Sequence, residues 1–355
     1  MSDVKEVKKE ETEFKPGISV DVGTSFLVVA RQKKDGTFVN KFHRNCLYPL
    51  DINDESIDLL ERSNYFFVKT DDKFYIIGDD ALSIINAIGK GSVIRPMANG
   101  ILSPTLQASS DLLFYIIKAI VGDPIVPKES LRFTIPANPV DRDIDNLFHQ
   151  KVLESFFIKL GYDAKPVNEA MCIIFDCNPI MKTEEGDVPL SGISMSFGAG
   201  MVNIAMSYKG MSLSEFSCTR SGDNIDEQAE KVTGVQKSKI VKIKEKKLDL
   251  DKIDPNDRVQ TALGIYYDET IDRVVSQMCN RFKEKSSELD GEIEIVVAGG
   301  TSMVPGFCKK LDSAIKKANM PFKIYRVRAS ETPFYSVVNG ACIRSQADYA
   351  KSLKK

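Results

Sequence analysis

Three glycine-rich turns, each at the end of an apolar strand-like run, constrain the fold of this 355-residue chain more than any other feature. They are DVGTS at 21–25, GAG at 198–200 and AGGTS at 298–302. A second apolar run leaves each of the first two turns, and these two units lie about 175 residues apart. Two similar strand-turn-strand units predict a duplicated α/β architecture.

The three turns are candidate phosphate contacts. Glycine adopts backbone angles that other residues avoid, so backbone N–H groups can approach a phosphate without interference from a side chain. One such turn alone is typical of a plain hairpin, whereas three in this order form a much narrower pattern. The chain has no GxxxxGK[ST] motif and no GxGxxG motif after a first strand, which argues against P-loop and dinucleotide-binding folds.

Composition is that of an ordinary globular protein, with 43% hydrophobic and 28% charged residues. A net charge of -2 gives no overall electrostatic case for binding nucleic acid directly. No signal peptide is evident and no apolar run approaches the roughly 20 residues that span a bilayer, so no membrane attachment is predicted. Seven scattered cysteines and only two histidines favour reduced thiols in a cytoplasmic protein over a zinc site.

Composition also changes along the chain and divides it into a tail and two domains. The tail is charged and poor in apolar residues, so it is predicted to be disordered. The boundaries are 1–17 for the tail, 18–180 for domain I, whose first strand is predicted to begin at Ile18, and 190–332 for domain II. The stretch at about 46–92 is predicted to be an inserted subdomain, 223–289 is mainly helical, and a helix at 333–350 closes the chain.

The sequence also predicts several local elements. Apolar spacing predicts helices over 79–88 and 141–160. The charged stretch 181–189 is predicted to be a linker between the domains, and the Lys-rich run 237–247 to break the helices of the second insert. The aromatic residues at 65–67 are predicted to lie in a strand core.

In their order along the chain, these motifs resemble those of the actin, heat-shock chaperone and sugar-kinase ATPase superfamily. The turn at 21–25 resembles its first phosphate motif, 198–200 the second and 298–302 the adenosine motif, while VNEA at 167–170 and VNGA at 338–341 resemble its two connecting helices. The resemblance covers almost the whole chain after the tail. It implies an α/β fold of the actin-like ATPase type, with two similar domains around a nucleotide cleft. Each domain would carry a smaller insert, at about 46–92 in domain I and about 223–289 in domain II, and the helix at 333–350 would complete domain I.

Within the superfamily, the chain is most similar to bacterial actins of the cell-shape (MreB) and magnetosome-filament (MamK) kind. This similarity rests on RP at 95–96, GIL at 100–102, GDNID at 222–226 and KE at 244–245.

The resemblance implies that the chain binds ATP or ADP with Mg²⁺. Asp21 would hold the hydrated magnesium and Glu169 would orient or polarise the attacking water, so these two are the predicted catalytic residues. Taken alone, Glu169 can equally be a solvated carboxylate in the first turn of a helix. The remaining predicted nucleotide contacts are Gly23, Thr24, Ser25, Gly198, Ala199, Gly200, Gly222, Lys244, Glu245, Gly299, Gly300 and Thr301.

The second phosphate motif departs from the family pattern. The family usually has an acidic residue two places before the first glycine and a threonine just after the last one. Here Ser196 and Met201 stand at those places, with Val202 next. An acidic side chain helps to hold the waters around magnesium, and a hydroxyl can orient the nucleophile. The sequence therefore predicts that nucleotide binding is kept while hydrolysis is slow or lost.

The predicted function is an actin-like protein that polymerises into cytoskeletal filaments in an ATP-dependent way, with copies of itself and an unidentified adaptor as partners. A non-polymerising actin-fold scaffold or reactivase-like switch is one alternative. A sugar-kinase-type phosphotransferase is another. Such an enzyme needs a carboxylate base facing the γ-phosphate, and Glu169 is the only candidate for it. A chaperone nucleotide domain is disfavoured because no peptide-binding segment follows the second connecting helix. The preference for ATP over GTP and the biological role stay open.

Overall fold

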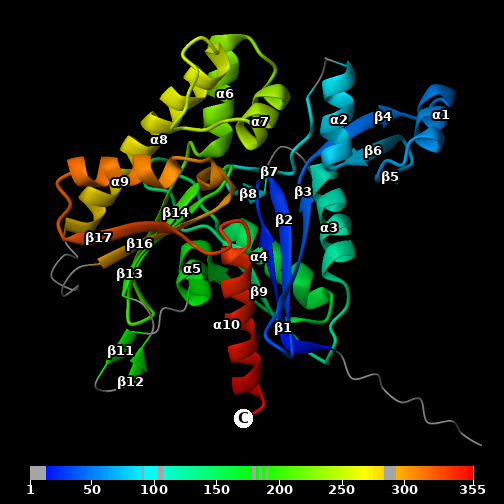
Figure 1. Ribbon diagram of the computed structural model, residues 1–355. Coiled ribbons are helices and arrows are strands. Elements are labelled where there is room, and N and C mark those ends of the chain that lie inside the picture. Colours follow the sequence, from blue (N-terminus) through cyan, green and yellow to red (C-terminus); the bar gives the residue numbers. More distant parts are fainter. Residues whose placement is uncertain are drawn as a thin grey trace, which may run out of the picture.

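Two five-stranded sheets lie side by side in the computed structural model, with two helices between them (Figure 1). The structure describes residues 13–88, 92–102, 107–177, 181–183, 186–188, 191–283 and 293–354. Most of the predicted tail, residues 1–12, therefore lies outside the described residues, as do the domain boundaries at 180 and 190 and positions 284–289 of the second insert.

The first sheet has the strand order β10-β9-β1-β2-β3. An antiparallel hairpin of β1 and β2 carries the first glycine turn at its tip, and β9 then pairs with β1 in parallel. The strands form because apolar residues such as Ile18, Val20 and Phe133 are fully buried. Their bounds are β1 (Phe14–Val22), β2 (Phe26–Lys33), β3 (Phe38–Arg44), β9 (Ser130–Ile135) and β10 (Asp163–Asn168).

The second sheet repeats this arrangement, with the order β15-β14-β13-β16-β17. The hairpin of β13 and β14 is antiparallel and carries the second glycine turn, and β16 pairs with β13 in parallel. The predicted duplication is therefore confirmed strand by strand. The bounds are β13 (Gly192–Phe197), β14 (Val202–Tyr208), β15 (Met211–Cys218), β16 (Ile293–Ala298) and β17 (Ile324–Ala329).

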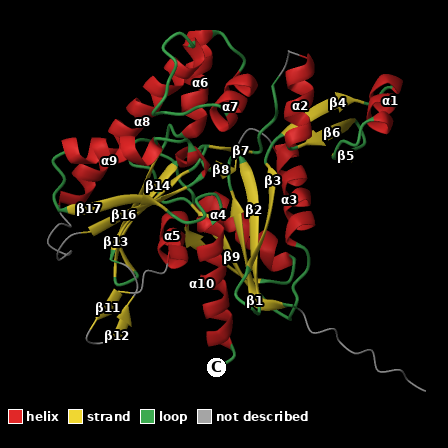
Figure 2. Cartoon of the chain, viewed as in Figure 1, coloured by secondary structure: helices red, strands yellow, loops and turns green. Residues whose placement is uncertain are grey.

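Helices cover the faces of both sheets (Figure 2). In the first domain they are α3 (Gln107–Val121), α4 (Leu147–Lys159) and α5 (Glu169–Cys177). In the second they are α6 (Gly222–Thr233), α7 (Lys237–Lys246), α8 (Arg258–Phe282), the short 3-10 helix η2 (Gly300–Met303) and α9 (Phe307–Lys317), and the chain closes with α10 (Ser336–Ser352).

The helix α10 joins the two domains. Val338 and Cys342 pack against Val28 and Ala30 of the first sheet. Val337 and Ala341, on another side of the same helix, pack with α5 against β14 and β16 of the second sheet. At the crossing of the two helices a Cβ on Gly340 would lie 1.7 Å from the carbonyl oxygen of Cys172, so the two backbones are in direct contact. This crossing fixes how the two sheets face each other.

The first insert has a core of its own, built from residues such as Leu60, Phe74 and Ile84. It consists of a small sheet in the order β4-β6-β5 and two helices (Figure 1). The bounds are β4 (Leu47–Asp51), α1 (Asp54–Arg62), β5 (Phe67–Lys69), β6 (Lys73–Ile77) and α2 (Asp79–Ile88). A two-stranded hairpin of β7 (Met97–Ala98) and β8 (Ile101–Leu102) follows.

The second insert is less separate from its domain. Ile225 of α6, Ile240 of α7 and Tyr267 of α8 belong to one continuous core with Ile193 and Ile295 of the second sheet. The long helix α8 runs from the top of this region down to the sheet (Figure 1).

The predicted helix over 141–160 is too long at its start, because α4 begins only at Leu147. Asp141 is used elsewhere: its carboxylate accepts hydrogen bonds from the backbone N–H and the hydroxyl of Thr219, and it pairs with Arg273 at 3.0 Å. The side chain of Asn146 donates to the carbonyl oxygen of Pro136 at 2.6 Å. These tertiary contacts hold 141–146 in an irregular conformation.

Other local predictions need correction. The first strand begins at Phe14 rather than Ile18, because the N–H of Gly17 donates to Glu129, so the predicted tail ends earlier. The predicted linker 181–189 contains the hairpin of β11 (Met181–Thr183) and β12 (Gly186–Val188). The Lys-rich run is itself the helix α7, whose Ile240 and Val241 are buried.

The prediction for the aromatic residues at 65–67 holds only for Tyr65, which is partly buried and packs against the core of the first insert. Phe66 and Phe67 are 54% and 39% exposed, so they do not lie in a strand core. Among the helices that the structure describes, none has the length and apolar character needed to cross a membrane.

The contact at Gly340 generates a stability prediction. The variant Gly340→Ala should lose about 1–3 kcal/mol of stability, because a methyl group there overpacks the crossing against rigid backbone. A shift of the urea unfolding midpoint to lower concentration measures this. Gly300→Ala is the matched control, since nothing lies within 4 Å of a Cβ at that position. Equal midpoints for the native chain and Gly340→Ala would contradict the prediction.

Candidate functional site

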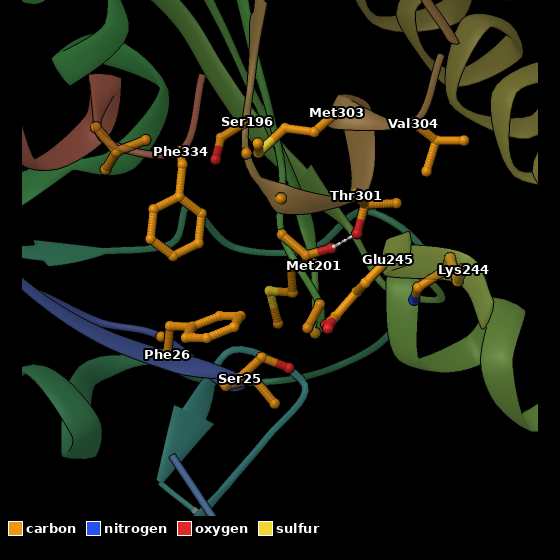
Figure 3. Close-up of a pocket in the computed structure, with 18 of the residues that line it drawn as sticks. Ser25, Phe26, Ser196, Met201, Lys244, Glu245, Thr301, Met303, Val304 and Phe334 are labelled. Carbon is orange, nitrogen blue, oxygen red and sulfur yellow. Dashed lines mark hydrogen bonds between the residues drawn. The ribbon is translucent and has the colours of Figure 1, made fainter. Parts of the chain in front are cut away.

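A cavity of about 560 Å³ lies between the two sheets, and all three glycine turns line it (Figure 3). Every predicted site residue except Gly222 contributes to its wall. These are Asp21, Gly23, Thr24, Ser25, Glu169, Gly198, Ala199, Gly200, Lys244, Glu245, Gly299, Gly300 and Thr301. Residues spread over 280 positions of sequence therefore line one cavity.

Hydrogen bonds to neighbouring residues hold the first turn in place. The N–H of Gly23 donates to the carbonyl oxygen of Phe26 at 3.0 Å, and the side chain of Asn45 donates to the carbonyl oxygen of Gly23 at 2.9 Å. A Cβ on Gly23 would lie 2.7 Å from the Phe26 oxygen, so the tight turn excludes other residues. The hydroxyl of Ser25 accepts a hydrogen bond from Arg95 at 3.3 Å.

The second turn lies directly against the first. A Cβ on Gly200 would lie 2.4 Å from the N–H nitrogen of Gly100 and 2.5 Å from the hydroxyl oxygen of Thr24. That hydroxyl also accepts a hydrogen bond from the N–H of Gly100 at 3.1 Å. The two turns, from different sheets, therefore approach each other around Gly100, and only glycine fits at position 200.

The unusual residues of the second turn both face the cavity. Ser196 and Met201 are 3% exposed and line its wall. The Met201 side chain lies 3.1 Å from where a Cβ on Gly100 would be, and its sulfur accepts a hydrogen bond from the Ser217 hydroxyl at 3.5 Å. A short hydroxyl and a thioether thus stand where the sequence pattern led us to expect a carboxylate and a hydroxyl.

The third turn closes over the second. Gly299 has a φ of 97°, and a Cβ there would lie 2.4 Å from the carbonyl oxygen of Phe197. The hydroxyl of Thr301 donates to the carbonyl oxygen of Gly198 at 2.8 Å. Gly222 lies behind this contact, because a Cβ there would be 2.3 Å from the Thr301 hydroxyl. Gly222 therefore supports the third turn rather than lining the cavity.

Two partly buried carboxyl groups mark one region of the cavity wall. Withdrawal from bulk water raises the pKa of Glu169 to about 8, and the nearby Asp21 carboxyl contributes to this rise. Withdrawal from water also raises the pKa of Asp21 to about 6, although the hydroxyl of Thr134 donates to it at 2.5 Å and opposes the shift. Because the negative charge of Asp21 acts on Glu169, a cation beside the two carboxyl groups would be favourable.

Asn203 is a site residue that the sequence analysis missed. Its side-chain N–H donates to Oε2 of Glu169 at 2.8 Å, and it lines the cavity while only 1% exposed. A polar amide among the apolar residues at 202–206 of β14 was the available signal. In the β13–β14 pairing it lies opposite Ser196, so both side chains belong to the same face of the sheet.

Lys244 and Glu245 take part in contacts within the protein. Lys244 pairs with the buried carboxylate of Asp226 at 2.7 Å. Glu245 accepts two hydrogen bonds, at 3.0 and 3.2 Å, from the guanidinium group of Arg44 in the first domain. Arg44 also lies 4.4 Å from the ring centre of Phe26. No local pattern in the sequence indicated that Arg44 and Glu245 would bridge the two domains.

Two further contacts bridge the domains. Arg95, just before the β7–β8 hairpin, pairs with Asp223 of α6 at 2.6 Å. The Ser238 hydroxyl of α7 donates to the Asn86 side chain of α2 at 2.8 Å. Together with Arg44 and Glu245, these contacts link the two inserts to each other and to the cavity.

The lining has the mixed character that a nucleotide needs. Tight backbone turns can receive phosphates, while Phe26, Phe334, Met303 and Val304 offer apolar surface for a base (Figure 3). No group of three or more His, Cys, Asp or Glu side chains with metal-binding geometry occurs among the described residues. Asp21 with water and phosphate oxygens is a donor set that suits Mg²⁺, which keeps much of its water when bound.

Comparison with known proteins supports this description. The family described as Volactin matches residues 17–345. A search of curated protein sequences found no match. Among solved structures, MreB5 of Spiroplasma citri bound to ADP matches with a TM-score of 0.62 at 14% identity, covering 97% of this chain and 98% of that chain.

Two further solved structures are similar. A non-polymerising mutant of MamK bound to AMPPNP has a TM-score of 0.51 at 14% identity, covering 94% of this chain and 100% of that chain. The ethanolamine utilization protein EutJ from Carboxydothermus hydrogenoformans has a TM-score of 0.53 at 12% identity, covering 94% of this chain and 91% of that chain. The chain therefore has the actin-like ATPase fold, as the order of the motifs predicted.

The two carboxyl groups generate a pH prediction for the nucleotide-free protein. Between pH 4.5 and about 8, native Glu169 keeps a proton that the unfolded chain releases, so stability falls as pH rises through this window. The variant Glu169→Gln removes this titration. Its melting temperature should fall by several degrees less than that of the native chain between pH 5 and pH 8.

Melting curves across this pH range, without nucleotide, make the measurement. Glu55→Gln, at an exposed position of α1, is the control and should keep the native pH dependence. If the melting temperatures of the native chain and Glu169→Gln fall in parallel, Glu169 does not retain a proton in the native state.

Proposed function

The chain belongs to the Volactin family, and from that membership and the geometry of the cavity we propose that it is an actin-like protein that binds ATP or ADP with Mg²⁺ and polymerises in response. The convergence of the first two turns at Thr24, Gly100 and Gly200 is the observation that carries the proposal. Two facing glycine turns suit a chain of phosphates held between two domains.

Each predicted residue has a role in this proposal. Asp21 holds the hydrated magnesium, while the turn around Gly23 and the turn at 198–200 contact the phosphates from opposite domains. Glu169 orients the attacking water. The third turn at 299–301 receives the adenosine, and Lys244 and Glu245 lie near the ribose. The ADP-bound MreB5 and AMPPNP-bound MamK structures support this proposal at the level of the ligand class.

Slow hydrolysis is part of the proposal. Ser196 offers no charge to hold the waters of a magnesium ion, and the thioether of Met201 cannot orient a water as a hydroxyl can. Each loss is worth about one to a few kcal/mol of barrier. Filaments would then be long-lived, because the event that promotes their disassembly is slow.

Self-association is the second part. The similar MamK chain is described as a non-polymerising mutant, so assembly is a relevant property of that protein. In this chain the first insert exposes Phe66, Phe67 and Ile88, which suit a contact between copies. All seven cysteines are unpaired thiols, which fits a cytoplasmic filament in a reducing compartment. A non-polymerising switch built on the same nucleotide site is the alternative outcome.

The proposed function predicts how the chain binds nucleotide and assembles. The native chain should pellet as filaments with Mg²⁺ and ATP and remain in the supernatant without nucleotide. Gly200→Val should weaken ATP binding at least tenfold, because the side chain would occupy the space between the two turns. Titration calorimetry and sedimentation measure the two effects.

Gly36→Asn, in an exposed turn with a φ of 96°, is the control, since asparagine tolerates this conformation. It should bind ATP and pellet like the native chain. Binding without filaments, across salt and protein concentration, would favour the non-polymerising switch over the filament. Undiminished ATP affinity in Gly200→Val would place the nucleotide elsewhere.

The proposed function also predicts how the rate of ATP hydrolysis changes when Ser196 is replaced. Ser196→Asp should increase phosphate release by on the order of tenfold, because it restores a charge beside the magnesium waters. Ser196→Ala, which restores none, should leave the rate near that of the native chain. A native turnover as fast as that of a bacterial actin assayed in parallel would contradict the weakened second turn.

A further inference from the structure

The side chain of Asn203 connects three parts of the molecule. It belongs to β14 of the second sheet and donates through Nδ2 to Oε2 of Glu169, at the start of α5, at 2.8 Å. Its Oδ1 accepts a hydrogen bond at 3.0 Å from the N–H of Ala137, which follows β9 of the first domain. The side chain is 1% exposed, so these bonds are shielded from bulk water.

The orientation of this amide follows from its neighbours. The backbone N–H of Ala137 can only donate a hydrogen bond, so the atom facing it must be the amide oxygen. The amide nitrogen then necessarily faces Glu169. Asn203 therefore presents a fixed N–H donor to one oxygen of the Glu169 carboxyl.

The segment that orients Asn203 is itself fixed. The Ser217 hydroxyl of β15 donates to the carbonyl oxygen of Ala137 at 2.8 Å, and Ser217 pairs with Asn203 between adjacent strands. Val140 also donates its N–H to the carbonyl oxygen of Ser217 at 2.9 Å. The amide of Asn203 is thus held by a backbone group that has little freedom to move.

We propose that Asn203 is a positioning residue for ATP hydrolysis, which holds Glu169 through Oε2 so that Oε1 faces the attacking water. This proposal rests on the nucleotide-binding function proposed above. It goes beyond that function because it assigns the orientation of the catalytic carboxylate to a side chain of the opposite domain. With Ser196 and Met201 in place of a carboxylate and a hydroxyl, this amide is the polar group of β14 that engages the reaction centre.

In the hydrolysis step that Glu169 assists, one bond to the γ-phosphorus forms and one breaks. The water oxygen forms a bond to the γ-phosphorus, and the bond from the γ-phosphorus to the bridging oxygen breaks with its electron pair going to ADP. The proton of the water passes to Oε1 of Glu169 and then to phosphate. A carboxylate whose Oε1 does not face the attacking water performs this step slowly, because small displacements of a positioned group lower the rate by large factors.

The experiment compares the steady-state kinetics of two variants with the native chain. Asn203→Ala removes both hydrogen bonds. Asn203→Leu keeps about the size of the side chain but has no group that can donate to Glu169. Both should lower kcat about tenfold or more, while KM and the ATP dissociation constant from calorimetry change less than about twofold. A kcat within twofold of native in Asn203→Leu would overturn the proposal.

Two further variants separate positioning from general loosening. Asn53→Ala removes an amide side chain and its hydrogen bond to the N–H of Ser56 in the first insert, away from Glu169 and Ala137, so its kcat should stay within about twofold of native. In a Glu169→Gln background, Asn203→Ala should cause no further loss, because a residue that acts through Glu169 has nothing left to position. An additional tenfold loss in that background would overturn the proposal.

The same assays are repeated in the Ser196→Asp background, where turnover should be faster. If neither the native chain nor Ser196→Asp releases phosphate faster than Glu169→Gln, Glu169 orients no water and the positioning role is overturned. Nucleotide binding measured by calorimetry is independent of this result. Failure of ATP to bind the native chain would instead overturn the proposed function itself.

Discussion

The backbone of α10 lies directly on the backbone of α5 where Gly340 meets the carbonyl oxygen of Cys172. A side chain at position 340 would push the helices apart and, with them, the sheets on which they pack. Because α10 packs on the first sheet and α5 on the second, this crossing sets the distance between the tips of two hairpins. The close approach of the second glycine turn, at Gly200, to Thr24 of the first turn and to Gly100 depends on it.

A second set of contacts holds the domains together on the side of the inserts. Arg44 reaches Glu245 and Arg95 reaches Asp223, so charged groups of the first domain meet carboxylates of the second. The Arg44 and Arg95 side chains are 9% and 20% exposed, which makes their pairs less screened by salt than surface pairs. The cavity is therefore bordered by helix packing, by glycine turns and by ion pairs. A ligand in it touches both domains and can couple its own state to their relative position.

The sequence predicted those parts of the site that backbone conformation determines. The three turns and the helix at 79–88 have local signals, because glycine at a strand end and apolar spacing depend little on distant residues. The role of Asn203, the pairing of Arg44 with Glu245 and the late start of α4 depend on which side chains the fold brings together. Asp141 illustrates this, since its partner Arg273 lies 132 positions away. No local pattern could have revealed these contacts.

Hydrogen–deuterium exchange with and without Mg²⁺ and ATP tests the central claim most directly, because it reads the backbone N–H groups of all three turns at once. The account predicts slower exchange in the peptides that contain 21–25, 198–200 and 299–301 when nucleotide is present, and no change at the exposed turn around Gly36. A nucleotide that binds between the domains must protect turns from both of them. Unchanged exchange in all three turns, at an ATP concentration that saturates the protein, would contradict the account.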